Sequence, residues 1–192
     1  MNEIELQLPT LHHKTAAEDF KNDFFEKEEK YIPGSAGFHD KKKYKQYEDW
    51  LTYTENNRQE STVSKDSVVV RTTFFAVRKY DNKIIGIIDI RHSLGEEKPL
   101  CKVTEYLQQY GGHIGYSVRP TERGKGYATE MLKMGLEYAK SLNLEKVMVG
   151  CESDNPQSIR TVEKCGGVFS KKHYENGKSF NVYLFDCIPL LI

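Results

Sequence analysis

The fold is decided by residues 113–140, HIGYSVRPTERGKGYATEMLKMGLEYAK. The first eight residues alternate between apolar and polar side chains, which predicts a β-strand over 113–120. Apolar side chains then recur at helical spacing, which predicts an amphipathic helix over 127–142. A short apolar run over 146–151 predicts a second, buried strand. The stretch therefore predicts a strand–helix–strand unit with a glycine-containing turn at its first corner.

This turn has the features of a phosphate-binding site. Gly124 and Gly126 carry no Cβ, so the backbone N–H groups around them can point toward one place. The unpaired N–H groups and the positive dipole end of the following helix face the same place. Such a site suits a diphosphate, and Arg123 and Lys125 add positive charge without specifying the ligand. Two nearby glycines are a weak signal alone, because a tight turn with close helix packing gives the same pattern.

The remaining sequence predicts a mixed α/β fold in a single domain, residues 1–192. Hairpin turns are expected at 81–82 and 176–177, and a helix N-cap at Asn155 or Asp154 before Pro156. The order of elements implies mostly antiparallel pairing around one strand–helix–strand crossover. Further strands are expected over 3–8, 68–80, 83–92, 168–175 and 178–188, and further helices over 13–30, 40–57, 101–110 and 156–166.

Composition narrows the class of partner. Lys plus Arg and Asp plus Glu both number 28, so no net charge favours nucleic acid or a membrane surface. No stretch approaches the ~18 apolar residues of a membrane span, and the N-terminal sequence lacks a secretory pattern, so a cytoplasmic location is expected. The cysteines show neither a C-x-x-C pair nor a matching histidine spacing, which favours free thiols and no metal site. They are Cys101, Cys151, Cys165 and Cys187.

Two motifs resemble those of the GCN5-related N-acetyltransferase (GNAT) superfamily. Residues 123–126, with Tyr127-Ala128 after them, fit its signature Arg/Gln-x-x-Gly-x-Gly/Ala. The run DNPQSIRTVEKCGGVF (154–169) is similar to its second cofactor segment, although two extra residues, Gly167 and Val168, precede the phenylalanine. The resemblance covers about residues 112–170 and implies a mixed, mostly antiparallel sheet with a splayed central strand pair flanked by helices.

The resemblance also implies acetyl-CoA as cosubstrate and an amine of a small molecule or peptide as acceptor. The diphosphate would lie on the glycine turn, and the pantetheine arm would pair with the strand at 116–118. The backbone N–H of Val118 would stabilise the tetrahedral oxyanion. The implied cofactor-binding residues are Tyr116, Ser117, Val118, Arg123, Gly124, Lys125, Gly126, Tyr127, Ala128, Thr129, Asn155 and Ser158.

Acetyl transfer requires a neutral amine. An alkyl amine with a pKa near 10.4 is almost entirely protonated at pH 7, and forming its neutral state costs about 4–5 kcal/mol. Asp89 is the first candidate for the general base, because a carboxylate within an apolar strand is expensive unless it is partnered. Arg91, on the same strand face, is the alternative structural partner of that carboxylate. His92, His113, Glu152 and Asp154 are further candidates for the base.

The sequence does not identify the residue that donates a proton to the leaving thiolate. Many superfamily members have a tyrosine where this chain has Val162, and Tyr127, Tyr174 and Tyr183 are substitutes without support from spacing. The absence of this tyrosine also motivates an alternative function, an acyl-CoA-binding sensor or interaction module without catalysis. The N-terminal helices, 13–57, are expected on the acceptor side, and a homodimer is a possible assembly.

A dinucleotide-binding fold is a second alternative. It would require G-x-G-x-x-G after the first strand, whereas Thr129 replaces the third glycine and the motif lies late in the chain. A P-loop is excluded, because neither Ser nor Thr follows the lysine in Gly124-Lys125-Gly126.

Overall fold

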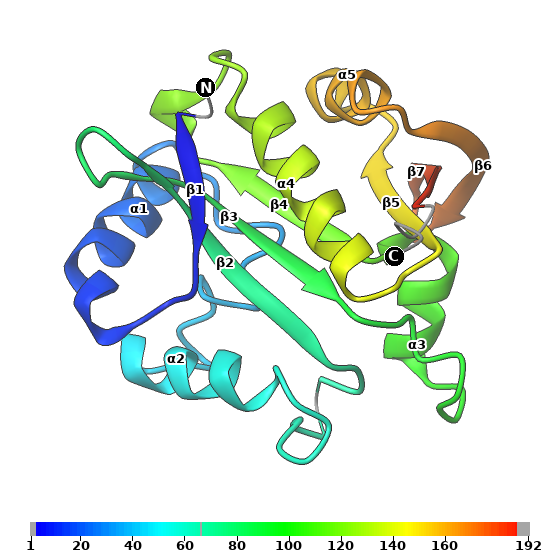
Figure 1. Cartoon of the computed structure of the whole chain (residues 1–192), viewed down its shortest axis with the longest axis horizontal. Coiled ribbons are helices and arrows are strands. Elements are labelled where there is room, and N and C mark those ends of the chain that lie inside the picture. The colour runs from blue at the N-terminus through cyan, green and yellow to red at the C-terminus, as the bar shows by residue number, and fades with distance from the viewer. Residues whose placement is uncertain (1–2, 66, 188–192) are drawn as a thin grey trace.

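Two antiparallel β-sheets form the framework of the computed structural model, which describes residues 3–65 and 67–187 (Figure 1). The first sheet has the strand order β1-β2-β3-β4, and the second has the order β5-β7-β6. All neighbouring strands in these orders pair antiparallel, as the sequence predicts. The strands are β1 (Ile4–Gln7), β2 (Arg71–Arg78), β3 (Ile84–Arg91), β4 (Ile114–Val118), β5 (Lys146–Glu152), β6 (Val168–Glu175) and β7 (Lys178–Asp186).

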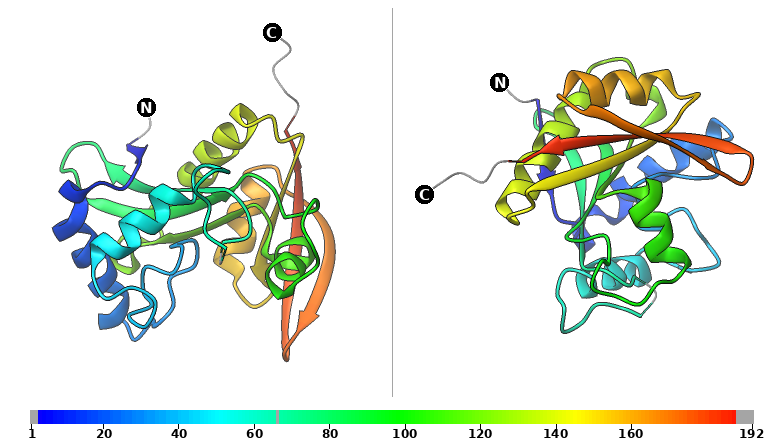
Figure 2. Two further views of the ribbon diagram at one scale, coloured as in Figure 1. Left: turned by 90° about the horizontal axis from the view of Figure 1, so that it is seen from below. Right: turned by 90° about the vertical axis from the view of Figure 1, so that its right-hand side faces the viewer.

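The helices divide between the two faces of the first sheet. In Figure 2, α1 and α2 lie on one face and α4 lies on the other. Each side has its own buried core, in which Phe20 and Trp50 pack with Ile87 on the α1–α2 face, and Met131 packs with Ile88 on the α4 face. The helices are α1 (Lys14–Glu26), α2 (Tyr47–Asn56), α3 (Lys102–Tyr106), α4 (Tyr127–Ser141) and α5 (Pro156–Lys164). Shorter turns are η1 (Leu11–His13), η2 (Leu107–Gly111, a π-helical turn) and η3 (Pro120–Glu122).

β4 and β5 meet at one end and then separate. The His113 N–H donates to the Met148 carbonyl at 2.7 Å, and the Met148 N–H donates to His113 Nδ1 at 3.0 Å. Gly112 forms a bridge with Val149 beside them. Beyond this contact the two strands belong to different sheets. The predicted splayed strand pair is therefore confirmed, and the gap between its strands is the natural place for an extended ligand.

Local sequence signals account for two of the connections. Asn176 and Gly177 both adopt left-handed conformations, with φ of 48° and 77°, which is the geometry of a two-residue hairpin turn. The Asn155 side chain accepts the Ser158 N–H at 3.0 Å, and Pro156 occupies the first helical position. The predicted hairpin and the predicted N-cap are confirmed.

Two predicted helix boundaries are wrong. α1 ends at Glu26, four residues before the expected end, and α2 begins at Tyr47, seven residues after the expected start. The Asp49 carboxylate accepts the backbone N–H groups of Lys45 and Gln46 at 3.1 and 3.2 Å, so the helix starts where this cap forms. The residues between the helices, 27–46, form a long connecting segment.

Two predicted connections also differ. The helix expected over 101–110 is α3 followed by η2. The expected two-residue turn at 81–82 is a five-residue connection, 79–83, and a register shift between Ala76 and Val77 accompanies it. Such a bulge changes which side chains of β2 lie opposite those of β3.

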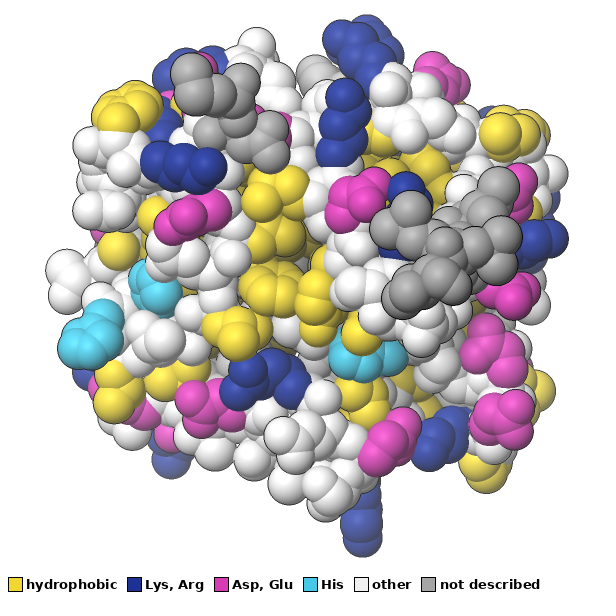
Figure 3. Space-filling view, in the orientation of Figure 1, with side chains coloured by type: hydrophobic (Ala, Val, Ile, Leu, Met, Phe, Trp, Pro, Cys, Tyr) yellow, Lys and Arg dark blue, Asp and Glu magenta, His cyan; other side chains and the backbone are white. Residues whose placement is uncertain are grey.

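One face of the molecule carries side chains of both charges. Figure 3 shows basic and acidic side chains interspersed over one face, with apolar side chains in its hollowed centre. Among residues 3–65 and 67–187, no helix combines the length and hydropathy of a transmembrane span, and no group of three metal-binding side chains occurs. Cys101, Cys151, Cys165 and Cys187 are free thiols.

The packing of η2 against β5 gives a test of the fold. A Cβ placed on Gly150 would overlap the backbone carbonyl oxygen of Tyr110, which cannot rotate away. We expect Gly150→Ala to lower the free energy of unfolding by about 2 kcal/mol or more, as overpacking does, measured by urea denaturation. Gly135→Ala is the control, because its Cβ would meet the mobile Cδ1 of Ile88 at 2.7 Å and alanine favours the helix. An equal loss in both variants would contradict this interpretation.

Candidate active site

The glycine turn connects β4, through η3, to the first turn of α4. Gly124 and Gly126 have φ of 80° and 90°, the left-handed region that side chains with a Cβ rarely adopt. A Cβ at either position would meet no atom within 4 Å, so the surface above the turn is open. Both glycines are exposed. The turn therefore has its predicted conformation and leaves room for a ligand against the backbone.

The backbone N–H groups of this turn are available. Within the described part of the chain, the N–H groups of residues 124–128 donate no hydrogen bond, whereas the Thr129 N–H donates to the Gly126 carbonyl at 3.0 Å. The free N–H groups include those of the first turn of α4, where the helix dipole is positive. Unpaired N–H groups at the N-terminus of a helix are suited to binding an anion.

The charged side chains of the turn are held by the protein's own acids. Arg123 forms two hydrogen bonds with Glu29 at 2.6 and 2.7 Å, and Lys125 Nζ lies 2.7 Å from Glu122 Oε2. Glu122 is buried, and it also bonds Arg78 and Lys83 at 3.0 Å each. These contacts fix the shape of the turn, while its backbone N–H groups stay unpaired within the described residues.

The amide groups of β4 alternate between β3 and the gap. The Arg119 N–H donates to Ile85 and the Arg91 N–H donates to His113, which fixes the odd-numbered residues of β4 as those bonded to β3. The backbone N–H groups of Tyr116 and Val118 therefore face β5 across the gap. Ser117 is turned the other way, and its hydroxyl donates to the Pro33 carbonyl at 2.7 Å, so the structure places this predicted cofactor contact away from the gap.

Side chains from α5 and β5 line the other side of the gap. The Tyr116 hydroxyl lies 3.2 Å from the Ser158 hydroxyl and so bridges β4 and α5. Burial raises the pKa of Tyr116 to about 12, and burial likewise raises the pKa of the neighbouring Cys151 thiol to about 11. Both groups are therefore protonated at neutral pH. Asn155, exposed at the start of α5, uses its side-chain oxygen for the N-cap described above.

Asp89 is fully buried and both of its oxygens are engaged. Thr73 Oγ1 donates to one oxygen at 2.8 Å, and Arg71 Nη2 donates to the other at 2.7 Å. Arg91 Nη2, the partner expected from sequence, is farther away at 3.7 Å. The carboxylate therefore has the surroundings of a structural ion pair, with Arg71 as its nearer partner, and it is not presented to an incoming amine.

The two histidines considered as bases are also engaged. His113 Nδ1 accepts the Met148 N–H at the join between the sheets, and burial lowers the pKa of His113 to about 4. His92 Nε2 lies 2.9 Å from Thr72 Oγ1, and burial lowers the pKa of His92 as well. Of the acidic candidates, Glu152 pairs with Lys178 at 2.5 Å and Asp154 is exposed.

The position at which many superfamily members have a tyrosine belongs to the hydrophobic core of this chain. Val162 is fully buried and packs with the α4-side cluster. The substitutes considered from sequence point elsewhere: the Tyr127 hydroxyl lies 3.4 Å from Arg78, the Tyr183 hydroxyl lies 3.2 Å from Glu163, and Tyr174 is 71% exposed. Tyr116 and Ser158 are the hydroxyls that the structure brings together in the gap.

A family model described as "Acetyltransferase (GNAT) domain" matches residues 6–168. The chain belongs to the GNAT acetyltransferase family. A curated relative, Uncharacterized N-acetyltransferase YnaD of Bacillus subtilis (strain 168), is 33% identical over 72 residues. That match covers 35% of this chain and 42% of the relative, so it spans less than half of the relative's length.

Solved structures of other GNAT proteins share the fold. Spermidine N-acetyltransferase from Vibrio cholerae, in complex with CoA and spermine, superposes with a TM-score of 0.59 at 15% identity, covering 96% of this chain and 95% of that one. The Microcin C7 self immunity acetyltransferase MccE, in complex with acetyl-CoA and AMP, gives 0.62 at 19% identity, covering 97% and 93%. At these identities the similarity shows the architecture.

Two features of this GNAT protein were not predicted from sequence. Tyr116 was expected to act only through its backbone, yet its hydroxyl reaches Ser158 across the gap. Because side chains alternate along a strand, the even-numbered side chains of β4 lie on the face covered by α4 and α5. This alternation was the sequence signal that could have indicated a role for the Tyr116 side chain. Arg71 was missed because its position opposite Arg91 depends on the bulge in the β2–β3 hairpin.

The ion pairs of Glu122 with Arg78, Lys83 and Lys125 predict that the stability of the fold depends on pH. The hydrogen bond from Lys125 lowers the pKa of Glu122 to about 2 from its ordinary 4.5, against the opposing effect of burial. A carboxyl with a lowered folded-state pKa stabilises the fold above its unfolded pKa and loses that contribution as the pH falls toward its folded pKa. We expect Glu122→Gln to reduce the free energy of unfolding at neutral pH.

This difference from the wild type should shrink between pH 4.5 and about 2, as measured by urea denaturation across that range. Glu137→Gln, which removes a surface pair with Lys140, is the matched control and should change little at any pH. A deficit in Glu122→Gln that is constant with pH would show that the charge of Glu122 is not its source.

Proposed function

We propose that this GNAT protein transfers an acetyl group from acetyl-CoA to an amine. The observation that carries the proposal is the set of unpaired N–H groups at residues 124–128, which open α4 and face solvent. Their number and the helix dipole suit the diphosphate of CoA. Family membership supports the same cosubstrate, because GNAT proteins of this fold are found with CoA or acetyl-CoA bound.

The pantetheine arm would run from the glycine turn along the gap between β4 and β5. The Val118 N–H is the first of the two gap-facing amides along this path, and the Tyr116 N–H lies about 7 Å farther on. The thioester is at the far end of the arm, so we assign the Val118 amide to the arm and the Tyr116 amide to the thioester carbonyl. This moves the oxyanion donor two residues from the sequence-based assignment. The exposed Asn155 amide and the Ser158 hydroxyl would contact the arm from α5.

The reaction would be a direct attack. The neutral amine nitrogen bonds to the thioester carbonyl carbon, and the negative charge on the oxygen is stabilised by the β4 amide. The carbon–sulfur bond then breaks, the nitrogen loses its proton to solvent, and the thiolate accepts a proton. Because both oxygens of Asp89 are engaged inside the protein, we assign Asp89 to positioning the arginines beside it. The Tyr116–Ser158 hydroxyl pair is placed to protonate the thiolate.

The cofactor assignment is tested at Gly126. A side chain there would stand in the open space above the turn, against the N–H groups that hold the diphosphate. We expect Gly126→Val to raise the Kd of acetyl-CoA about a hundredfold, equivalent to losing two charge-assisted hydrogen bonds of about 1.5 kcal/mol each, measured by calorimetry.

Gly177→Val is the matched control for that experiment. Gly177 has a similar φ of 77° and the same absence of atoms within 4 Å of a Cβ, so the backbone strain is comparable. It lies in the hairpin turn between β6 and β7, outside the proposed binding site. Equal weakening of acetyl-CoA binding in both variants would remove the glycine turn from the ligand site.

The proton-donor assignment is tested at the hydroxyl pair. We expect Tyr116→Phe and Ser158→Ala each to lower kcat about tenfold, because a thiolate is a tolerable leaving group and needs less help than an alkoxide. In Tyr116→Phe the Kd of acetyl-CoA should stay close to that of the wild type, whereas Ser158→Ala also removes a proposed contact with the pantetheine arm and should raise it. Tyr183→Phe is the control, since its hydroxyl bonds Glu163 away from the gap. If Tyr183→Phe slows turnover as much as the other two, the assignment is incorrect.

A second function shares the same cofactor site. The buried valine at position 162 and the engaged state of Asp89 favour an acyl-CoA-binding module without catalysis. Such a module would bind acetyl-CoA, but no amine would release free CoA thiol from it. An assay for CoA thiol with a panel of amines distinguishes the two functions directly.

A further inference from the structure

A buried group of two arginines and one aspartate lies on the α1–α2 face of the first sheet. Arg71 Nη2 is 2.7 Å from Asp89 Oδ2, and Arg91 Nη2 is 3.7 Å from the same oxygen. In the described residues, Asp89 is the only acidic side chain that forms an ion pair with either guanidinium. The group, called here the arginine pair, therefore carries one uncompensated positive charge.

The arginine pair lies beside the proposed reaction centre. Asp89 is opposite Gly115 in the β3–β4 register, and paired Cα atoms in such a ladder are about 5.5 Å apart. Gly115 precedes Tyr116, whose amide we assign to the thioester. Asp89 faces the α1–α2 side because its neighbours Ile88 and Ile90 pack in the α4-side core. The charge therefore sits on the face from which an acceptor would approach.

The arginine pair has hydrogen-bonding capacity left. Arg91 Nη1 donates to the Gly112 carbonyl at 2.9 Å, but the Nε atoms of Arg71 and Arg91 are both buried and have no partner. A buried charge without a counter-ion is costly, and so is a buried donor without an acceptor. Burial, followed by repulsion from Arg71, lowers the pKa of Arg91, which expresses the same deficit of negative charge. One carboxylate, with a single charge and two acceptor oxygens, would satisfy both needs.

The arginine pair is not sealed from solvent. The Arg71 side chain is 14% exposed, compared with 1% for Asp89. Tyr31 and Tyr106 are exposed by 62% and 38%. Both phenols act electrostatically on Arg91, so they lie within electrostatic reach of the arginine pair.

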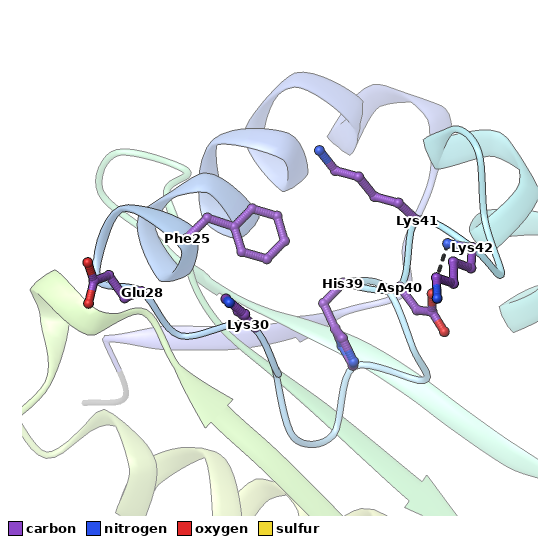
Figure 4. Close-up of a pocket in the computed structure, with 7 residues that line it drawn as sticks. All are labelled: Phe25, Glu28, Lys30, His39, Asp40, Lys41 and Lys42. Carbon is purple, nitrogen blue, oxygen red and sulfur yellow. Dashed lines mark hydrogen bonds between the residues drawn. The ribbon is translucent and has the colours of Figure 1, made fainter.

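The approach to this face is also basic. Residues 27–45 carry six lysines against three acids, in a chain whose total charge is zero. A pocket of about 860 Å³ opens on this segment (Figure 4). Its charged lining residues are three lysines and two acids, namely Lys30, Lys41, Lys42, Glu28 and Asp40, and His39 also lines it. The His39 ring contacts the Tyr31 ring at 4.7 Å between centroids, and Tyr31 in turn acts electrostatically on Arg91. Clustered positive charge attracts anions at long range.

We propose that the arginine pair binds a carboxylate of the acceptor, so that the substrates of this GNAT protein are amines that carry a carboxylate, as amino acids and short peptides do. The inference rests on the proposed acetyl transfer and adds its substrate class. A polyamine carries no group that would neutralise the arginine pair, and its own charge would be repelled by the lysines of residues 27–45. A phosphate, with up to two negative charges, would overcompensate the single excess charge of the buried group.

Matched acceptors give the test. CoA release from acetyl-CoA is followed with the full-length protein and pairs of L-amino acids and dipeptides with their carboxamides, and with spermidine. We expect kcat/KM for each carboxylate to exceed that for its carboxamide by about tenfold or more, as loss of a charge-assisted contact predicts. The carboxamide has the less basic amine and hence more neutral nucleophile, so this preference would oppose intrinsic reactivity.

Variants locate the preference. In Arg71→Gln and Arg91→Gln, the ratio of kcat/KM for the carboxylate to kcat/KM for its carboxamide should fall toward one. The fall should come from a raised KM for the carboxylate. The Kd of acetyl-CoA should be unchanged. Lys140→Gln, on α4 at the opposite face of the first sheet, is the control and should keep the ratio. A ratio that persists in both arginine variants would overturn the assignment. If the variants do not fold, the comparison of acceptors with the wild type decides.

The outcomes separate the two proposals. Equal or faster turnover of carboxamides or spermidine would overturn the carboxylate site and leave acetyl transfer in place. Binding of acetyl-CoA without release of CoA thiol by any amine would overturn the proposed function, and the acceptor class with it.

Discussion

The join between the two sheets is the contact on which the site depends. His113 and Met148 exchange two hydrogen bonds at one end of β4 and β5, and no strand pairing continues beyond it in the described chain. One of these bonds uses the His113 ring as acceptor, which requires a neutral imidazole. Burial lowers the pKa of His113 to about 4, so the acceptor is present throughout the physiological pH range. The strands are thus fixed at their base and are left apart where a ligand must enter.

The alternation of β4 then separates three tasks within five residues. Its odd-numbered amides hold β3, its even-numbered amides face the gap, and its even-numbered side chains reach toward α4 and α5. Tyr116 combines two of these tasks, since its amide faces β5 and its hydroxyl meets Ser158. The opposite face of the same sheet carries Asp89 and the arginines. Cofactor and acceptor chemistry can therefore meet at one strand without competing for the same groups.

The parts of the site that were predictable from sequence are local. The conformation of Gly124 and Gly126, the start of α4 and the Asn155 cap depend on residues within one turn of the chain, so short motifs specify them. The partner of Asp89 depends on pairing across β2 and β3. A two-residue turn at 81–82 would have placed Thr73 opposite Ile90. The observed connection and the bulge after Ala76 place Thr73 opposite Asp89 and Arg71 opposite Arg91. No pattern in the sequence indicates that shift, so the arginine pair could not be predicted.

The two anion-binding features differ in how they obtain their positive charge, and this difference fits their roles. The glycine turn uses backbone dipoles, while its charged side chains, Arg123 and Lys125, are paired with Glu29 and Glu122. Dipoles attract a diphosphate that must be bound and later released as CoA without holding it by full charges. The arginine pair instead keeps one full charge in a nearly dry place, where electrostatic interactions are stronger and more selective. Under the proposed function, a chain with no net charge would in this way bind a highly charged cosubstrate reversibly while discriminating among acceptors by a single carboxylate.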